Sequence, residues 1–267
     1  MTFAEKYGPW AVIAGASEGT GKEFARQIAA QGVNCFLIAR REGPLIDLAR
    51  QIAAEFGVEC RTAALDLSLP DAGARVIEAI AGLDVGLYVA NAGSDPHGAK
   101  LLDRPASGWR AMINRNVTAI FDCCYHFAGT MKQRGKGGMI LVNSGACYGG
   151  ASYMAIYSAS KAFDLCLGES LWAELRPFGV DVLNLVMGET DTPEYRRFLA
   201  AKGISFREGA ADAAAVAALG LEQLPNGPTC NWGVAPGDAP FGAVSADQRR
   251  ERVQIIEQVS KPIYEKF

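Results

Sequence analysis

Residues 10–22 read Trp-Ala-Val-Ile-Ala-Gly-Ala-Ser-Glu-Gly-Thr-Gly-Lys, and this stretch decides the fold. The apolar run Trp10–Ala14 predicts a buried strand, and glycines at positions 15, 19 and 21 form a GxxxGxG turn into a helix from Lys22. Small residues let the backbone approach a pyrophosphate, and the first N–H groups of the helix point at that anion. The stretch therefore predicts the phosphate loop of a dinucleotide-binding fold.

An ATP-binding P-loop is the competing phosphate site. It needs a glycine at position 16 and Ser or Thr directly after Lys22. The chain has Ala16 and Glu23 at these positions, so this alternative is excluded. The glycine pattern alone is also compatible with a plain glycine-rich turn. The position of the pattern at the first strand–helix junction favours the phosphate loop.

Short apolar runs alternate with longer helical stretches. Strands are expected at Trp10–Ala14, Cys35–Ala39, Thr62–Ala64, Gly86–Ala90, Met139–Asn143 and Val180–Val186. Helices are expected at Lys22–Gln31, Gly43–Glu55, Ala72–Ala81 and Trp109–Lys132. Alternating strands and helices predict a parallel sheet, and strands that are apolar throughout predict helices on both faces. The fold class is therefore α/β, a Rossmann-type doubly wound parallel sheet.

The 267 residues are expected to form a single domain, 1–267. Asn226–Gly242 is rich in Gly and Pro and predicts a loop. Ser245 is expected to cap a final helix from Ala246 to about Val259, within a C-terminal helical extension of about 245–267.

Composition excludes several classes of function. The net charge of −3 offers no basic field for nucleic acid, and no apolar run reaches the ~18 residues that span a bilayer. Met1–Tyr7 lacks the apolar core of a signal peptide. Seven cysteines without CxxC spacing and only two histidines argue against a disulfide framework or a metal site. We therefore expect a cytoplasmic protein with no metal, no nucleic-acid partner and no membrane span.

Tyr157 and Lys161 are four residues apart, so on a helix they share one face. A lysine ammonium beside a phenol favours the phenolate, and such a tyrosine can exchange a proton with a carbonyl or alcohol oxygen. Ser144 follows an expected strand and could position the substrate oxygen. Taken alone, a YxxxK pair is more often a surface feature, so the surrounding motifs carry the inference.

The order GxxxGxG, Asn91-Ala92-Gly93, Asn116, Ser144 and Tyr157-xxx-Lys161 resembles the short-chain dehydrogenase/reductase family. The resemblance runs from about Tyr7 to about Gly233. It implies a hydride-transferring oxidoreductase with a catalytic tetrad of Asn116, Ser144, Tyr157 and Lys161. The chain departs from the family pattern at Ala14, Thr20, Ala90 and Met187, and no departure removes a tetrad member.

The same resemblance implies the residues that contact the cofactor. Asp66 would contact the adenine, Lys161 would hold the nicotinamide ribose, and Gly188–Thr192 would contact the carboxamide. The full set of expected cofactor residues, apart from the arginines below, is Gly15, Ser17, Glu18, Gly19, Thr20, Gly21, Asp66, Leu67, Asn91, Ala92, Gly93, Tyr157, Lys161, Gly188, Thr190 and Thr192.

The end of the second strand indicates which cofactor is preferred. NAD enzymes place Asp or Glu there to bind the ribose 2′-hydroxyl, and a carboxylate would repel the 2′-phosphate of NADP. The chain has Ala39 followed by Arg40 and Arg41. Arg40 is expected to bind the 2′-phosphate with help from Arg41, so NADP(H) is preferred and NAD(H) remains usable. Two solvated turn arginines are the alternative.

The opening Glu5–Trp10, together with Gly32-Val33-Asn34, is similar to hydroxysteroid dehydrogenases of the family, the bacterial 7β and vertebrate 17β types. The substrate pocket is expected between the loop after Gly93, Tyr148–Tyr153, and a substrate-covering segment of about 190–210 that includes Tyr195 and Phe198. These segments predict an apolar alcohol or ketone as substrate, with a hydroxysteroid as one candidate.

Other substrates and a different class of function stay open. A smaller ketone or a 3-oxoacyl thioester is the alternative substrate, and a non-catalytic NADP-binding sensor is the alternative class. Family members commonly pair through the helices that would here carry Asn116 and Tyr157, so the resemblance implies a homodimer or homotetramer.

Overall fold

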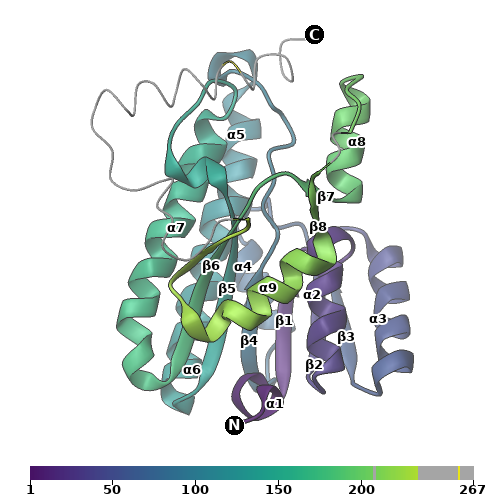
Figure 1. Cartoon of the computed structure of the whole chain (residues 1–267), viewed down its shortest axis with the longest axis vertical. Helices are drawn as coiled ribbons and strands as arrows, with labels where there is room; N and C mark the ends of the chain where they lie inside the picture. Colours follow the sequence, from purple (N-terminus) through teal and green to yellow (C-terminus); the bar gives the residue numbers. More distant parts are fainter. Residues whose placement is uncertain (207–208, 234–257, 259–267) are drawn as a thin grey trace.

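The computed structural model describes residues 1–206, 209–233 and 258 (Figure 1). Its main sheet has seven strands in the order β3-β2-β1-β4-β5-β6-β9, and every neighbouring pair is parallel. This is the doubly wound α/β sheet that the alternating pattern predicts. The strands are β1 Trp10–Ala14, β2 Asn34–Ala39, β3 Cys60–Ala64, β4 Val85–Ala90, β5 Gly137–Ser144, β6 Val180–Met187 and β9 Thr229–Asn231.

Helices cover both faces of this sheet (Figure 1). The α-helices are α1 Phe3–Tyr7, α2 Gly19–Ala30, α3 Glu42–Phe56, α4 Ala72–Ala79, α5 Ala106–Ile113, α6 Ala119–Arg134, α7 Ala155–Leu175, α8 Pro193–Ala201 and α9 Ala213–Gln223. Short 3-10 turns are η1 Leu101–Asp103, η3 Gly145–Tyr148, η4 Arg176–Phe178 and η5 Leu224–Asn226.

The core has two layers, because successive side chains of a strand point to opposite faces. In β1, Ile13 packs into the layer with Phe24 of α2 and Leu48 of α3. Its neighbour Val12 packs into the other layer with Phe127 of α6. All five residues of β1 are buried, which explains the continuous apolar run seen in the sequence.

Two expectations from the pattern are wrong. Asn226–Gly242 is not a loop throughout, because Thr229–Asn231 forms strand β9 at the sheet edge beside β6. The expected helix Trp109–Lys132 is interrupted by a π-helix, η2 Asn114–Thr118, between α5 and α6. The expected helix Ala246–Val259, within the extension of about 245–267, lies outside the described residues.

A second, two-stranded parallel sheet pairs β7 Thr190–Asp191 with β8 Ala211–Asp212. Helix α8 lies in the segment between these strands and is drawn at the upper right of Figure 1. Pairing of β7 with β8 brings the two ends of this segment together. The segment that carries α8 therefore follows β6 and is held at both of its ends.

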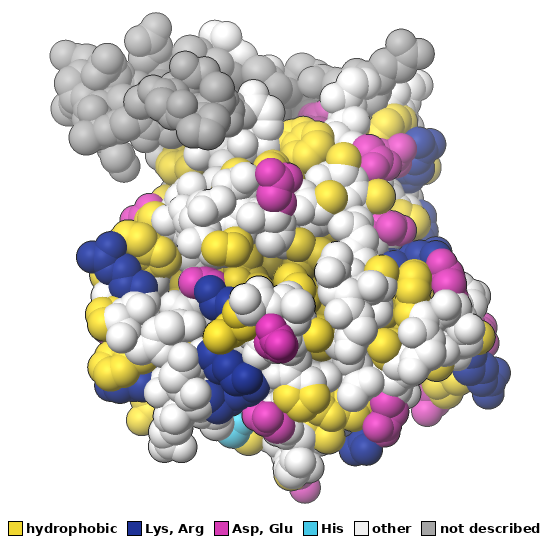
Figure 2. All heavy atoms as spheres, turned by 60° about the horizontal axis from the view of Figure 1, so that its bottom comes forward, with side chains coloured by type: hydrophobic (Ala, Val, Ile, Leu, Met, Phe, Trp, Pro, Cys, Tyr) yellow, Lys and Arg dark blue, Asp and Glu magenta, His cyan; other side chains and the backbone are white. Residues whose placement is uncertain are grey.

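The face at the lower side of Figure 1 comes forward in Figure 2, where acidic and basic side chains are intermixed with hydrophobic ones. Ion pairs join Lys6 to Asp181 and Arg134 to Asp84, the latter at 3.1 Å.

In the part of the chain that the structure describes, no helix combines the length and apolar character needed to cross a bilayer.

Candidate functional site

The turns after β1, β2, β4, β5 and β6 meet at one edge of the sheet, because the carboxyl ends of parallel strands share an edge. Gly15 and Gly19 in the first turn have positive φ angles of 80° and 56°, a conformation that glycine adopts without strain. A Cβ on Gly21 would lie 2.1 Å from the Gly15 carbonyl oxygen. Glycine is therefore required at these positions for the turn to close.

Helix α2 begins directly from this turn, and its N-cap residue Glu18 makes no side-chain cap. The first N–H groups of the helix are thus left for an anion, as a phosphate loop requires. Thr20 is buried, and its hydroxyl has no hydrogen-bond partner among the described residues. Ser17 is half-buried in the same turn. The open helix terminus and this unpartnered hydroxyl fit a dinucleotide pyrophosphate.

Asn91 ties the turn after β4 to the glycine turn: its Nδ2 donates to the Gly15 carbonyl oxygen at 3.0 Å. Gly93, two residues on, lies against Lys161, since a Cβ at position 93 would sit 2.9 Å from the Lys161 Nζ. The Asn91-Ala92-Gly93 segment therefore connects the phosphate loop to the Tyr157–Lys161 helix.

Glu18 forms a bridge between two arginines from distant parts of the chain. Its carboxylate accepts a hydrogen bond from Arg41, at 2.6 Å, and another from Arg197 of α8. Burial raises the pKa of Glu18, but the two arginines outweigh it and hold the pKa below its ordinary value. Glu18 therefore carries its charge at neutral pH, and Arg41 already has a carboxylate partner.

Arg40 is exposed and forms no hydrogen bond or ion pair with any described residue. It lies within electrostatic reach of Asp66 and Arg115. Asp66 accepts two hydrogen bonds from Ser68, at 2.9 Å and 2.7 Å, through one carboxylate oxygen. Burial raises the pKa of Asp66, whereas Ser68 and the two arginines bring it below its ordinary value.

A small apolar cavity of about 10 Å³ lies between the sheet and helix α6. Leu67 and Ala92, two of the expected cofactor residues, line it together with Arg115. The cavity is thus bordered by the turn after β4 and by the segment after β3. The residues that line it are Ala14, Leu67, Val76, Tyr88, Ala90, Ala92, Arg115, Ala119, Ile120 and Cys123.

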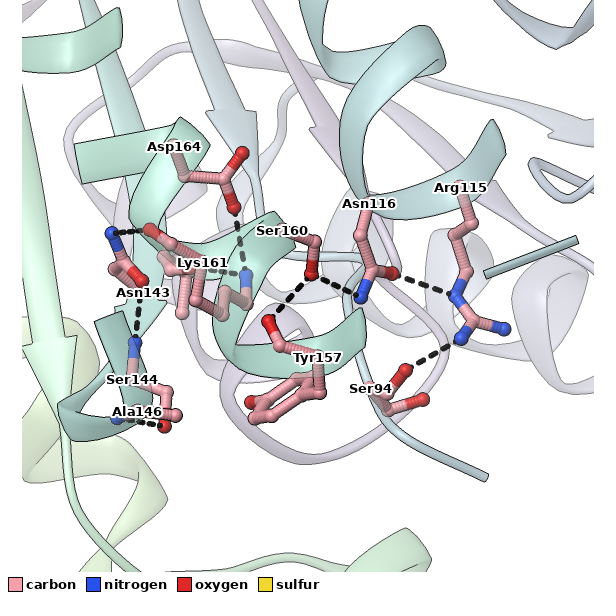
Figure 3. Close-up of polar contacts among 11 residues, drawn as sticks. Ser94, Arg115, Asn116, Asn143, Ser144, Ala146, Tyr157, Ser160, Lys161 and Asp164 are labelled. Atoms are coloured by element: carbon pink, nitrogen blue, oxygen red, sulfur yellow. Dashed lines mark hydrogen bonds and ion pairs between the residues drawn. The ribbon is translucent and has the colours of Figure 1, made fainter. Parts of the chain in front are cut away.

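Tyr157 lies in the first turn of α7, and Ser144 is the last residue of β5. In Figure 3 the hydroxyl end of Tyr157 points to the side on which Ser144 lies. The backbone N–H of Ser144 donates to Asn143 Oδ1 at 2.8 Å, and its hydroxyl accepts from the Ala146 N–H at 3.3 Å. The strand end and the turn η3 therefore fix Ser144 on the Tyr157 side of the site.

Lys161 is one helical turn beyond Tyr157 and only 2% exposed. Its ammonium donates to the Val142 carbonyl oxygen at 2.9 Å and to Asp164 at 3.0 Å. Burial lowers the pKa of Lys161, but the Asp164 carboxylate, together with Tyr157 and Cys147, holds the pKa above its ordinary value. Lys161 is therefore a fixed positive charge on the face of α7 that carries Tyr157.

Asn116 is completely buried in the π-helix η2 and is held from two sides. Its Nδ2 donates to the Ser160 hydroxyl at 3.3 Å, and its Oδ1 accepts from Arg115 at 3.1 Å (Figure 3). Ser160 in turn donates to the Tyr157 carbonyl oxygen at 2.8 Å. These contacts attach the π-helix to the first turn of α7. All four residues of the expected tetrad therefore lie in one region.

The expected carboxamide segment follows β6. Gly188 is exposed, whereas Thr190 is buried in β7. Thr192 caps α8 and lies against the phosphate loop, since a Cβ on Gly19 would be 2.9 Å from its methyl group. The segment thus reaches from the end of β6 back to the glycine turn.

The segments expected to line the substrate pocket carry several aromatic side chains. Tyr195 stacks on Phe198 with ring centroids 6.4 Å apart and meets Phe206 edge-on at 6.2 Å. Tyr148 donates to Asn231 of β9 at 2.7 Å. Tyr153 is buried at 5% exposure.

Sequence reasoning missed three residues of this site. Arg115 donates to the Ser94 carbonyl oxygen at 2.6 Å and so fixes the turn after Gly93, while Ser160 and Asp164 support the tetrad from within α7. The only local signal was that Ser160 and Asp164 fall one helical turn from Tyr157 and Lys161 respectively.

Comparison with known proteins gives a consistent picture. The model of the short chain dehydrogenase family matches residues 9–202. A 7beta-hydroxysteroid dehydrogenase of Collinsella aerofaciens is 38% identical over 195 residues, which cover 72% of this chain and 73% of that protein.

Two solved structures extend the similarity to the fold. One, a 7beta-hydroxysteroid dehydrogenase, matches with a TM-score of 0.84 at 30% identity over 95% of this chain and 100% of its own. A short-chain dehydrogenase from Sphingobium yanoikuyae in complex with NADPH matches with a TM-score of 0.79 at 25% identity, covering 92% of this chain and 95% of its own.

Proposed function

The chain belongs to the short-chain dehydrogenase family of oxidoreductases acting on CH–OH donors, and from this premise we propose that it interconverts a hydroxysteroid and its ketone with NADP(H). The observation that carries the proposal is the meeting of Ser144, Tyr157, Lys161 and Asn116 beside the phosphate loop. The similarity to 7β-hydroxysteroid dehydrogenases over most of the chain supports the substrate class.

A nicotinamide cofactor would lie along the carboxyl edge of the sheet. The open N-terminus of α2 and the glycine turn would hold the pyrophosphate. Ser68 bonds to only one carboxylate oxygen of Asp66, so the other oxygen would contact the adenine. Asn91-Ala92-Gly93, Lys161 and Gly188–Thr192 would border the nicotinamide half. When bound, the nicotinamide supplies or accepts the hydride.

The side chains of the tetrad supply the proton chemistry. In ketone reduction the Tyr157 hydroxyl gives its proton to the carbonyl oxygen, and in alcohol oxidation it takes the proton back. The Ser144 hydroxyl holds that oxygen in place. The Lys161 ammonium stabilises negative charge on the phenol, and Asn116 fixes the start of α7 through Ser160.

NADP(H) is the proposed cofactor because β2 ends without a carboxylate. Arg40 has no partner among the described residues and directly follows the end of β2, beside which we expect the ribose 2′-hydroxyl or 2′-phosphate to lie. Arg41 is already paired with Glu18, so Arg40 makes the main contact and Arg41 assists. NAD(H) is expected to bind more weakly. The NADPH complex of a structural relative supports this preference.

The apolar side chains around Tyr157 suit a flat, hydrophobic substrate. Tyr195, Phe198 and Phe206 form an aromatic group on the segment of about 190–210, which would cover the substrate. Tyr148 and Tyr153 would face it from the turn after Ser144. In this proposal the whole chain acts as one domain.

The proposal includes a homodimer or homotetramer in the cytoplasm. Phe121 and Tyr125 on α6 are 47% and 76% exposed, with ring centroids 6.2 Å apart. Two exposed aromatic rings on one helix suit contact with a second copy of the chain. No disulfide joins the seven cysteines, all of which are described, and this suits a reducing compartment.

Kinetic assays with steroids test the proposal. NADPH with a 7-ketosteroid, and NADP⁺ with a 7β-hydroxysteroid, should give a higher kcat/KM than short aliphatic ketones give. Tyr157→Phe should still bind NADPH but lose ~10²-fold or more in turnover, as expected for a lost acid/base group. Tyr125→Phe, which removes a hydroxyl from an exposed ring on α6, is the matched control and should keep full turnover.

The outcomes separate the alternatives. If steroids neither react nor inhibit while small ketones react, the substrate assignment is wrong. If NADPH binds and no ketone or alcohol reacts, the chain is a cofactor-binding sensor. A lower KM for NADH than for NADPH, at comparable turnover, would overturn the cofactor preference.

A further inference from the structure

Asp164 is a buried carboxylate that the proposed mechanism does not use. It lies on α7, three residues after Lys161, and its side chain is 1% exposed. One carboxylate oxygen accepts from the Lys161 ammonium at 3.0 Å, and the other has no hydrogen-bond partner among the described residues. Burying a charge in this way is costly, and an apolar residue of similar volume would fill the space without that cost. The carboxylate therefore points to a role in the chemistry of the site rather than in packing.

The contact places Asp164 next to the proposed proton-transfer machinery. The Lys161 ammonium has three N–H bonds. Two of them are directed to the Val142 carbonyl oxygen of β5 and to Asp164, as Figure 3 shows for Asp164. The backbone of Gly93 lies against the same ammonium. Asp164 and Val142 thus leave the third N–H for the Tyr157 and cofactor side.

The charge of Lys161 depends on this contact. A buried lysine without a counter-charge tends to lose its proton, with a pKa depressed by up to 3–5 units. Here burial lowers the pKa of Lys161, and Asp164, with smaller contributions from Tyr157 and Cys147, brings the pKa above its ordinary value. Burial also raises the pKa of Asp164, against the opposing pull of Lys161.

The other titratable groups around the pair come from four elements. Tyr157 of α7 and Cys147 of η3 face Lys161, whereas Tyr88 of β4 and Cys124 of α6 face Asp164. Burial raises the pKa of both Tyr88 and Cys124, so these two groups stay uncharged at neutral pH. They therefore cannot replace the charge of Asp164.

We propose that Asp164 is a positioning residue for the reaction: it keeps Lys161 charged and fixed beside Tyr157, and so sets the upper pH limit of turnover. This inference rests on the proposed role of Lys161. Without the carboxylate, Lys161 would lose its proton at lower pH and would no longer stabilise the charge that Tyr157 develops.

Nuclear magnetic resonance of protein labelled at the lysine Cε carbons measures the charge of Lys161 directly, without cofactor or substrate. A Lys161→Met protein identifies the Lys161 signal by its loss. Asp164→Asn keeps a hydrogen-bond acceptor and removes only the charge. It should lower the Lys161 titration midpoint by about 2 pH units or more, since full burial alone shifts lysines by up to 3–5 units.

Two further variants make the test specific. Asp164→Leu fills the same buried space without a polar atom and should lower the midpoint at least as far. Ser158→Ala removes a different buried hydroxyl of α7, one that has no partner among the described residues, and should leave the midpoint unchanged. A midpoint in Asp164→Asn or Asp164→Leu that equals or exceeds that of the unmodified protein overturns the proposal.

The pH dependence of kcat then connects charge to turnover. With NADPH and a 7-ketosteroid, the pH at which kcat falls off should drop in Asp164→Asn by the same amount as the Lys161 midpoint. A uniform loss of kcat at every pH would mean that Asp164 is merely structural. If no steroid reacts even with the unmodified protein, the proposed substrate fails, while the resonance titration still decides the role of Asp164.

Discussion

Replacing Arg40 by alanine separates the two nicotinamide cofactors. Arg40 is exposed and unpaired among the described residues, so its guanidinium can meet a 2′-phosphate without first breaking another contact. A hydrogen bond to a charged group contributes roughly 1.5–3 kcal/mol. Since each 1.4 kcal/mol is about tenfold, Arg40→Ala should weaken NADPH by about 10- to 150-fold. NADH lacks the phosphate and should lose little affinity.

The neighbouring arginine gives the matched control. Arg41 is already paired with Glu18 at 2.6 Å. An exposed ion pair of this kind contributes about 0.2–1 kcal/mol to stability, and Arg41 would lose that energy if it moved to bind the phosphate. Arg41→Ala should therefore weaken NADPH less than Arg40→Ala does. Arg40→Lys keeps the charge but not the forked geometry and should fall between the two.

Isothermal titration of each variant with NADPH and NADH at one low salt concentration checks the prediction. An equal loss for both cofactors in Arg40→Ala would refute the reasoning, because it would place Arg40 away from the 2′-position. A larger loss in Arg41→Ala than in Arg40→Ala would show that NADPH opens the Arg41–Glu18 pair.

Three more outcomes are expected. Gly21→Ala would force a Cβ to 2.1 Å from the Gly15 carbonyl oxygen, so it should weaken NADPH at least about tenfold and lower the free energy of unfolding by about 1–3 kcal/mol. Gly43→Ala, with open space around it in helix α3, should leave NADPH binding unchanged and should not lower the free energy of unfolding, because alanine favours the helix. Titration and thermal melts measure the two quantities. The lowered pKa of Glu18 means that its ion pairs stabilise the fold above that pKa and fade as pH falls through it, so the difference in Tm between the unmodified protein and Glu18→Gln should be present at neutral pH and vanish in acid. Tyr125→Glu should shift the chain to a smaller species in size-exclusion chromatography with light scattering; an unmodified chain that is already monomeric would contradict the proposed pairing.

Most of the sheet was predictable because its strands are buried on both faces. β1 and β4 are buried at every position and read as unbroken apolar runs. These runs identify the strands without the alternation of apolar and polar residues that marks a half-buried strand. β9 was missed for the opposite reason. Thr229–Asn231 is a three-residue edge strand, half-buried, and pairs only with β6 among the described strands, so neither length nor hydrophobicity marks it.

The site was predictable where its motifs are local and was missed where contacts span the chain. Tyr157 and Lys161 are one helical turn apart, and that spacing alone predicts a shared face. The bridge from Glu18 to Arg197 joins residues 179 positions apart, which no local pattern shows. Asp164 reads in the sequence as a residue for the polar face of a helix, and only the packing of α7 against the sheet buries it.

Because η2 is a π-helix, the position of Asn116 in the site depends on the number of residues in the segment Asn114–Thr118. A π-turn holds more residues than an α-turn, so the segment Asn114–Thr118 lets Asn116 reach α7 while the faces of α5 and α6 stay on the core. Deleting one residue here would convert the π-turn into an ordinary α-turn, and the faces of α5 and α6 would keep their relative orientation. The wide turn that lets Asn116 reach Ser160 of α7 would then be lost. During divergence, a single-residue deletion here should therefore be disfavoured, which is a constraint on chain spacing that a comparison of residue types alone would not reveal.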